Sequence, residues 1–269
     1  MTNNRDEHQH QQILPIGYDV DNGNEVLISK GWLKEGLKDA RREADDRPEL
    51  RERVNSNPSG FLGKVYTEGD SGYVKENKET FFRRLEGRFA PSEILKTKLA
   101  YMLAKYGHRW QERKELWEDG RKVRYFEHVR RVALILMDTP EMDGIFCPEG
   151  VQIALLHDVL EDTKDISAEI LEMMFGREVV LGVIAMTKRK GMSTEEYQRG
   201  LKRHGIAPWI KLCDRLDNMR HCRIEYVGEE FREKQKVETL EYWMGWFLEL
   251  VGKHDHPLYV ELEGLVMKS

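Results

Sequence analysis

Residues 151–163, VQIALLHDVLEDT, constrain this chain more than any other stretch. Their apolar positions follow a helical period, so we expect one largely buried helix. On that period His157, Asp158 and Glu161 share one face, and Asp162 lies one turn beyond Asp158. Buried carboxylates beside an imidazole are costly unless a metal, protons or cations compensate their charge. The alternative interpretation is an exposed acidic helix end with a hydrogen-bonded histidine.

The bulk composition excludes several classes of protein. A chain of 269 residues with 40% hydrophobic and 34% charged residues can bury one generous domain, or one domain with an extension. Its net charge of −5 argues against a protein that coats nucleic acid. We find no apolar run of membrane-spanning length and no signal-peptide core, and three cysteines without a CxxC pair suit a reducing compartment. We therefore expect a cytoplasmic protein with no membrane or nucleic-acid partner, and its oligomeric state stays open.

Residues 1–90 are predicted to form an N-terminal extension of unknown role, followed by one domain over residues 91–269. About the first 12 residues are polar, and we expect them to be disordered. A short strand is predicted at residues 26–28 and a charged helix at residues 32–46. The extension contains no motif that carries chemistry, and its fold is poorly predicted.

From residue 91 onwards helices are predicted to follow one another, which favours an all-α bundle. Helical spacing indicates a helix over residues 91–108, with Ser92 as a plausible N-cap, and another over residues 126–137. His128 lies on the apolar face of the second helix. A lone histidine in that position is more often a hydrogen-bonded core residue than a metal ligand.

Polar groups from three predicted helices together form a candidate metal site. Asp214 and Asn218 stand one helical turn apart, so both can face one cleft, although an ordinary charged helix start has the same pattern. Adding Asp214 to His128 and the pair His157–Asp158 gives two imidazoles and two carboxylates. This mixture suits an octahedral Mn²⁺, Fe²⁺ or Mg²⁺ ion with open water positions better than a closed, cysteine-rich zinc site.

The residues beside these ligands indicate hydrolysis. A metal of this kind lowers the pKa of the water it binds and so supplies a nucleophile. Glu161 and Asp162, one turn from the ligands, can hold that water or move its proton. Lysine and arginine side chains nearby can neutralise a phosphorylated substrate. The pattern therefore favours metal-assisted hydrolysis of a phosphoester or pyrophosphate.

The order of these ligands resembles that of the HD phosphohydrolase superfamily. Four longer strings resemble, more specifically, the hydrolase domain of RelA/SpoT-type alarmone enzymes and their small single-domain relatives. They are YFEHVRRVALIL (125–136), ALLHDVLEDT (154–163), FGREV (175–179) and IKLCDRLDNMR (210–220). The resemblance covers roughly residues 92–251. HD enzymes of the dNTP triphosphohydrolase type usually follow the His-Asp pair with a Gly/His-rich run, so VLEDT argues against that branch.

The resemblance implies an all-α bundle that removes the 3′-pyrophosphate of (p)ppGpp with Mn²⁺, so a guanine nucleotide is the expected substrate. It implies metal ligands at His128, His157, Asp158 and Asp214, an acid–base pair at Glu161 and Asp162, and nucleotide contacts from Arg113, Lys114 and Asn218.

The chain departs from the family pattern at three places. The family's Arg-Lys pair fits Arg113 and Lys114, but the longer segment that follows offers residues 121–122 (Arg-Lys) for the same role. Val129 replaces the usual proline after the first metal histidine, which we expect to affect packing only. Asp217 replaces a usual His or Tyr, and we expect its charge near the nucleotide pocket, where it can alter substrate choice.

Two alternatives stay open on these grounds. The same metal site can act on another nucleotide, as an NADPH phosphatase or an adenine alarmone hydrolase. The domain can also be a non-catalytic, nucleotide-sensing module. An intact ligand set beside Glu161 and Asp162 argues against the second alternative, because a sensor has no physical need to bury so much negative charge.

Overall fold

The computed structural model describes residues 13–18, 25–29, 78–116, 122–139, 142, 144–222 and 227–268. The chain divides into two compact units, Met1–Pro58 and Ser59–Ser269. In the first unit β1 (Ile13–Tyr18) pairs antiparallel with β2 (Glu25–Ser29), with Leu14 opposite Ile28. The strand predicted at residues 26–28 is therefore confirmed. The helix predicted at residues 32–46 and the disorder predicted for the first 12 residues lie outside the described residues.

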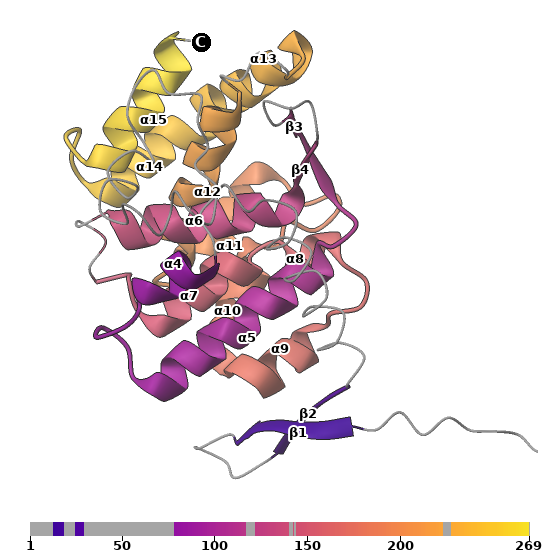
Figure 1. The fold of residues 1–269 in the computed structure, drawn as a ribbon. Helices are drawn as coiled ribbons and strands as arrows, with labels where there is room; N and C mark the ends of the chain where they lie inside the picture. The colour runs from indigo at the N-terminus through magenta and orange to yellow at the C-terminus, as the bar shows by residue number, and fades with distance from the viewer. Residues whose placement is uncertain are drawn as a thin grey trace, which may run out of the picture. The chain divides into compact units, whose positions relative to one another are not determined.

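The described residues of the second unit form helices and one small hairpin (Figure 1). Its elements are α4 (Lys78–Arg83), α5 (Pro91–Gly107), β3 (Glu112–Leu116), β4 (Lys122–Arg124), α6 (Tyr125–Asp138), α7 (Pro148–Leu156), α8 (Val159–Asp162), α9 (Ala168–Phe175), α10 (Arg177–Met186), α11 (Thr194–Lys202), α12 (Ala207–His221), α13 (Glu229–Glu238), the π-helix η2 (Thr239–Trp243), α14 (Met244–Val251) and α15 (Pro257–Lys268). The predicted all-α class is confirmed. None of the described helices combines the length and apolar character that a bilayer crossing requires.

The core of this unit lies where α5, α6, α7 and α12 pack against one another (Figure 1). Helix α6 is buried along nearly its whole length, and α7 is buried from Gly150 to Leu156. Helix α4 also joins the core, since the rings of Phe81 and Phe82 each lie 5.3 Å from that of Tyr101 on α5. The domain boundary expected after residue 90 stays a prediction. Helix α4 precedes that boundary in the sequence but packs against α5, which follows it.

The ends of the helices follow local chemistry. Helix α5 begins with Pro91, whose missing N–H costs nothing in the first turn, and Glu93 Oε2 accepts a hydrogen bond from the Ala90 N–H at 2.6 Å. The N-cap is therefore Ala90, and Ser92, predicted for this role, lies inside the helix. Helix α6 ends at Asp138, and Thr139 is extended because it precedes a proline.

The single helix predicted over residues 151–163 is wrong in one respect, because it is broken into α7 and α8 at His157 and Asp158. The imidazole Nδ1 of His157 donates to the Ala154 carbonyl at 2.8 Å, which is the acceptor that the backbone N–H of Asp158 would use in a continuous helix. The break thus falls at two of the four predicted metal ligands.

Candidate metal centre

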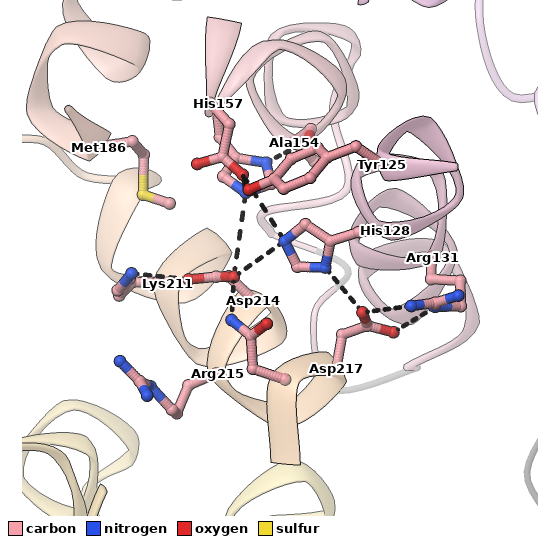
Figure 2. Close-up of polar contacts among 12 residues, drawn as sticks. Tyr125, His128, Arg131, Ala154, His157, Met186, Lys211, Asp214, Arg215 and Asp217 are labelled. Carbon is pink, nitrogen blue, oxygen red and sulfur yellow. Dashed lines mark hydrogen bonds and ion pairs between the residues drawn. The ribbon is translucent and has the colours of Figure 1, made fainter. Parts of the chain in front are cut away.

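Four side chains from three parts of the bundle converge on one point. His128 comes from α6, His157 and Asp158 from the turn between α7 and α8, and Asp214 from α12. His128 Nε2 lies 3.1 Å from Asp214 Oδ1 and 3.6 Å from Asp158 Oδ2. His157 Nε2 lies 2.9 Å from Asp158 Oδ2. The same nitrogen lies 3.9 Å from Asp214 Oδ1 (Figure 2). The structure therefore brings together all four residues predicted as ligands.

Both histidines present Nε2 to this point. His157 Nδ1 faces the Ala154 carbonyl, which only accepts, and His128 Nδ1 lies 2.7 Å from Asp217 Oδ2. Each Nδ1 therefore carries the proton, and each Nε2 is left for a proton or a metal. His157 Nε2 is buried and makes no well-aligned hydrogen bond. Imidazole lone pairs that face carboxylate oxygens repel them unless a cation lies between, so the donor set fits a divalent metal.

The electrostatics of the centre are set by burial and by neighbouring charges. Burial alone would raise the pKa of Asp214, but the Lys211 ammonium, 2.6 Å from its Oδ2, holds that pKa well below its usual range. Burial likewise opposes charge on His157, yet the Asp158 carboxylate raises the pKa of the imidazole to about 9. Below that pKa, the His157–Asp158 pair therefore holds a proton when no metal is bound.

Lys211 leaves only one oxygen of Asp214 for the centre. Its Nζ is bound to Oδ2, while Oδ1 faces His128 and accepts a hydrogen bond from Asn218 Nδ2 at 2.7 Å. The ammonium also lies 5.4 Å from the ring centroid of Trp243, and the Lys211 side chain is mostly covered, with 14% exposed. Lys211 was not among the sequence-predicted site residues, although its position three residues before Asp214 is a helical-neighbour signal.

Asp217 was expected near the nucleotide pocket. The structure buries its side chain beside His128, and its effect on substrate choice stays a prediction. Its side chain is 1% exposed and accepts hydrogen bonds from Arg131 Nε at 2.6 Å and from Arg131 Nη2 at 3.0 Å (Figure 2). Burial would raise the pKa of Asp217, but Arg131 and then His128 keep it far below its usual range. The carboxylate thus lies behind His128. Asp217 follows Asp214 by three residues on α12, so the two side chains lie on the same side of that helix.

Tyr125 is a further residue that sequence reasoning missed. Its hydroxyl donates to Asp158 Oδ2 at 2.8 Å, and its ring stacks on that of His108 with the centroids 4.8 Å apart. Tyr125 is the first residue of α6, three residues before His128. Only that helical spacing from a predicted ligand could have identified it.

The predicted acid–base pair, Glu161 and Asp162, lies on the exposed side of the centre. Glu161 Oε2 accepts a hydrogen bond from the backbone N–H of Lys188 at 2.9 Å. Partial burial of the carboxyl, and then the charge of Asp158, raise the pKa of Asp162 to about 6; partial burial raises that of Glu161 as well. Carboxylates with pKa values raised toward neutrality can accept and return protons.

The predicted nucleotide contacts separate in the structure. Arg113, on β3, donates from Nη2 to Asn218 Oδ1 at 2.9 Å and is thereby linked to the metal centre. Its neighbour Lys114 instead lies over the ring of Phe231, with Nζ 3.8 Å from the centroid. Of the competing pair, Lys122 forms an exposed ion pair with Glu112, whereas residue 121 lies outside the described residues. The roles of these residues stay predictions.

The all-α bundle and the histidine–aspartate cluster are the features of the HD-type class of hydrolases, and this chain has both. No family model matches the chain. The chain is 32% identical over 162 residues to the guanosine-3′,5′-bis(diphosphate) 3′-pyrophosphohydrolase MESH1 of Xenopus tropicalis, covering 55% of this chain and 85% of that protein. The chain therefore belongs to the MESH1 family of hydrolases.

Other relatives agree with this assignment but are covered less completely. The MESH1 protein of Drosophila melanogaster is 37% identical over 127 residues, which span 45% of this chain and 66% of that protein. A probable guanosine-3′,5′-bis(diphosphate) 3′-pyrophosphohydrolase of Mycoplasma pneumoniae is 28% identical, and the match spans only 25% of its length. A solved structure of a metazoan SpoT orthologue that hydrolyses ppGpp aligns with a TM-score of 0.50 at 28% identity, covering 64% of this chain and 94% of that one.

Proposed function

We propose that this chain is a Mn²⁺-dependent hydrolase that removes the 3′-pyrophosphate of (p)ppGpp and releases GDP or GTP with pyrophosphate. The observation that carries the proposal is the convergence of two imidazole Nε2 atoms and two carboxylates at one buried point. Membership of a family whose relatives are named for this reaction supports the choice of substrate.

Four residues would hold the metal: His128, His157, Asp158 and Asp214. The described residues offer no cysteine at this point, and the mixed nitrogen and oxygen donors favour Mn²⁺, Fe²⁺ or Mg²⁺ over a structural zinc ion. When bound, such an ion supplies Lewis acidity and activates water at neutral pH.

The protein's own groups would then handle the proton and the substrate. Glu161 and Asp162 accept the proton of the attacking water, whose oxygen forms a bond to the phosphorus attached to the ribose 3′ oxygen. The bond between that phosphorus and the 3′ oxygen breaks, and the carboxyl pair returns the proton to the departing 3′ oxygen. Arg113 offers a planar set of donors suited to phosphate and is already oriented by Asn218.

The test is product analysis of the purified chain with Mn²⁺, using ppGpp, NADPH and a panel of dNTPs as separate substrates and EDTA as the control. We expect GDP and pyrophosphate from ppGpp alone, and no products in EDTA. Turnover of NADPH or a dNTP in place of ppGpp would overturn the substrate. Metal binding without turnover of any nucleotide would overturn the catalytic proposal and favour a sensing module.

A further inference from the structure

The two histidines of the metal centre are oriented by different kinds of partner. His157 is held by the backbone carbonyl of Ala154, which any residue at position 154 would supply. His128 is held by a side chain, because its Nδ1 lies 2.7 Å from Asp217 Oδ2. The orientation of His128 therefore depends on the identity of one residue.

The carboxylate of Asp217 is also bound by the guanidinium of Arg131. Arg131 Nε donates to Oδ1 at 2.6 Å and Arg131 Nη2 donates to Oδ2 at 3.0 Å, so the guanidinium uses both carboxylate oxygens (Figure 2). His128 and Arg131 stand three residues apart on α6, which places them on one face, and Asp217 reaches them from α12. The exposed fractions of His128 and Asp217 are 1% each, so water does not compete for these bonds.

We propose that Asp217, held by Arg131, is the positioning residue that fixes the ring and the tautomer of His128 and thereby sets how tightly the centre binds its metal. A carboxylate that accepts the Nδ1 proton of a histidine makes the opposite nitrogen a more basic ligand and restricts ring rotation. This inference rests on the proposed function only in requiring a divalent metal at the centre, and it is independent of the nucleotide.

The decisive variant is Asp217→Asn, which keeps the volume and removes the charge. An amide has one acceptor oxygen, so it cannot receive bonds from both His128 and the two donors of Arg131. Calorimetric titration of the full chain with Mn²⁺ should show a Kd raised about 10- to 100-fold with the stoichiometry unchanged. Arg131→Lys keeps the positive charge but not the planar pair of donors, and should raise the Kd by a smaller factor.

A control variant removes another two-bond arginine–carboxylate pair of α12, which joins that helix to α15. Arg220 on α12 donates to both carboxylate oxygens of Glu261, each at 2.7 Å. Glu261→Gln should lower the unfolding temperature measured in EDTA but leave the Kd for Mn²⁺ unchanged. A loss of affinity in Asp217→Asn alone therefore cannot be assigned to general loosening of α12.

Nitrogen-15 NMR of the histidine rings in the metal-free chain supplies a readout that a purely structural role would not move. We expect the wild-type His128 resonances to show the proton on Nδ1, and Asp217→Asn to redistribute it between the two nitrogens. An unchanged tautomer together with an unchanged Kd would overturn the inference. A wild-type chain that binds no divalent metal would overturn it together with the proposed function, whereas metal binding without nucleotide hydrolysis would overturn the proposed function alone.

Discussion

The candidate site has two layers whose side chains are held very differently. The inner layer consists of His128, His157, Asp158, Asp214 and Asp217, and the outer layer consists of Arg113, Lys114, Glu161 and Asp162. Inner residues lie on packed helices or the turn between them, and each contacts a partner in the same cluster. Outer residues lie on a short strand and a four-residue helix. The inner layer can therefore hold an ion before any substrate arrives, while the proposed substrate contacts of the outer layer lie at positions that solvent still reaches.

The largest effect is expected from removing a carboxylate of the inner layer. Asp158 Oδ2 faces both imidazoles, so Asp158→Ala should abolish Mn²⁺ binding in calorimetry and reduce ppGpp turnover below detection. Circular dichroism of the variant should match that of the wild type. Full activity with one Mn²⁺ per chain would exclude Asp158 as a ligand.

The next largest effect should come from the acid–base pair of the outer layer. Glu161→Gln keeps the shape of the side chain and removes the proton acceptor, so Mn²⁺ should remain bound while kcat falls by about 10²- to 10⁴-fold. Comparing this variant with Asp158→Ala separates loss of the metal from loss of the proton step. If kcat stays at the wild-type level, Glu161 has a structural role through its bond to Lys188.

A smaller effect is expected at the nucleotide contacts, and it should differ between neighbours. Arg113→Ala removes a charged donor already oriented by Asn218, so kcat/KM for ppGpp should fall by about 10- to 100-fold, the range for a charge-assisted hydrogen bond. Lys114→Ala should lower kcat/KM by a smaller factor, because the Lys114 ammonium lies over Phe231. Equal losses in steady-state assays would indicate that both side chains bind the nucleotide.

The smallest effect is expected at the exposed ion pair of the β3–β4 hairpin. Lys122 and Glu112 form an ion pair 3.1 Å long, with both side chains more than half exposed. Such pairs contribute little, so Lys122→Ala should leave kcat/KM within about threefold of the wild type. A larger loss would transfer the phosphate-binding role from Arg113 to the second basic pair.

The inner layer was largely predictable from the sequence, because helical spacing and buried polar groups carry a strong signal. His128, His157, Asp158 and Asp214 were each predicted, and the structure brings them together. What spacing could not supply was the break between α7 and α8, which depends on a side chain bonding the Ala154 carbonyl. A periodic pattern assumes a continuous helix, so it does not show where a side chain replaces a backbone N–H as the donor to a carbonyl.

The supporting residues were harder to predict for a different reason. Asp217 and Lys211 are charged residues on a helix that looks amphipathic, and a sequence does not state which charges are buried. Asp217 was predicted near the nucleotide pocket from its place in the sequence motif, whereas the structure buries it beside Arg131. The β3–β4 hairpin was also missed, since its residues are polar and lack the alternation that indicates a strand.

The charge balance around the three inner carboxylates predicts the order in which metal and nucleotide bind. Of the three inner carboxylates, Asp214 is offset by Lys211 and Asp217 by Arg131, so Asp158 contributes one negative charge that a proton on His157 can offset. A divalent cation in place of that proton changes the net charge of these groups from zero to plus one. A highly charged polyphosphate is then attracted only by a loaded centre, so metal should bind first and nucleotide second.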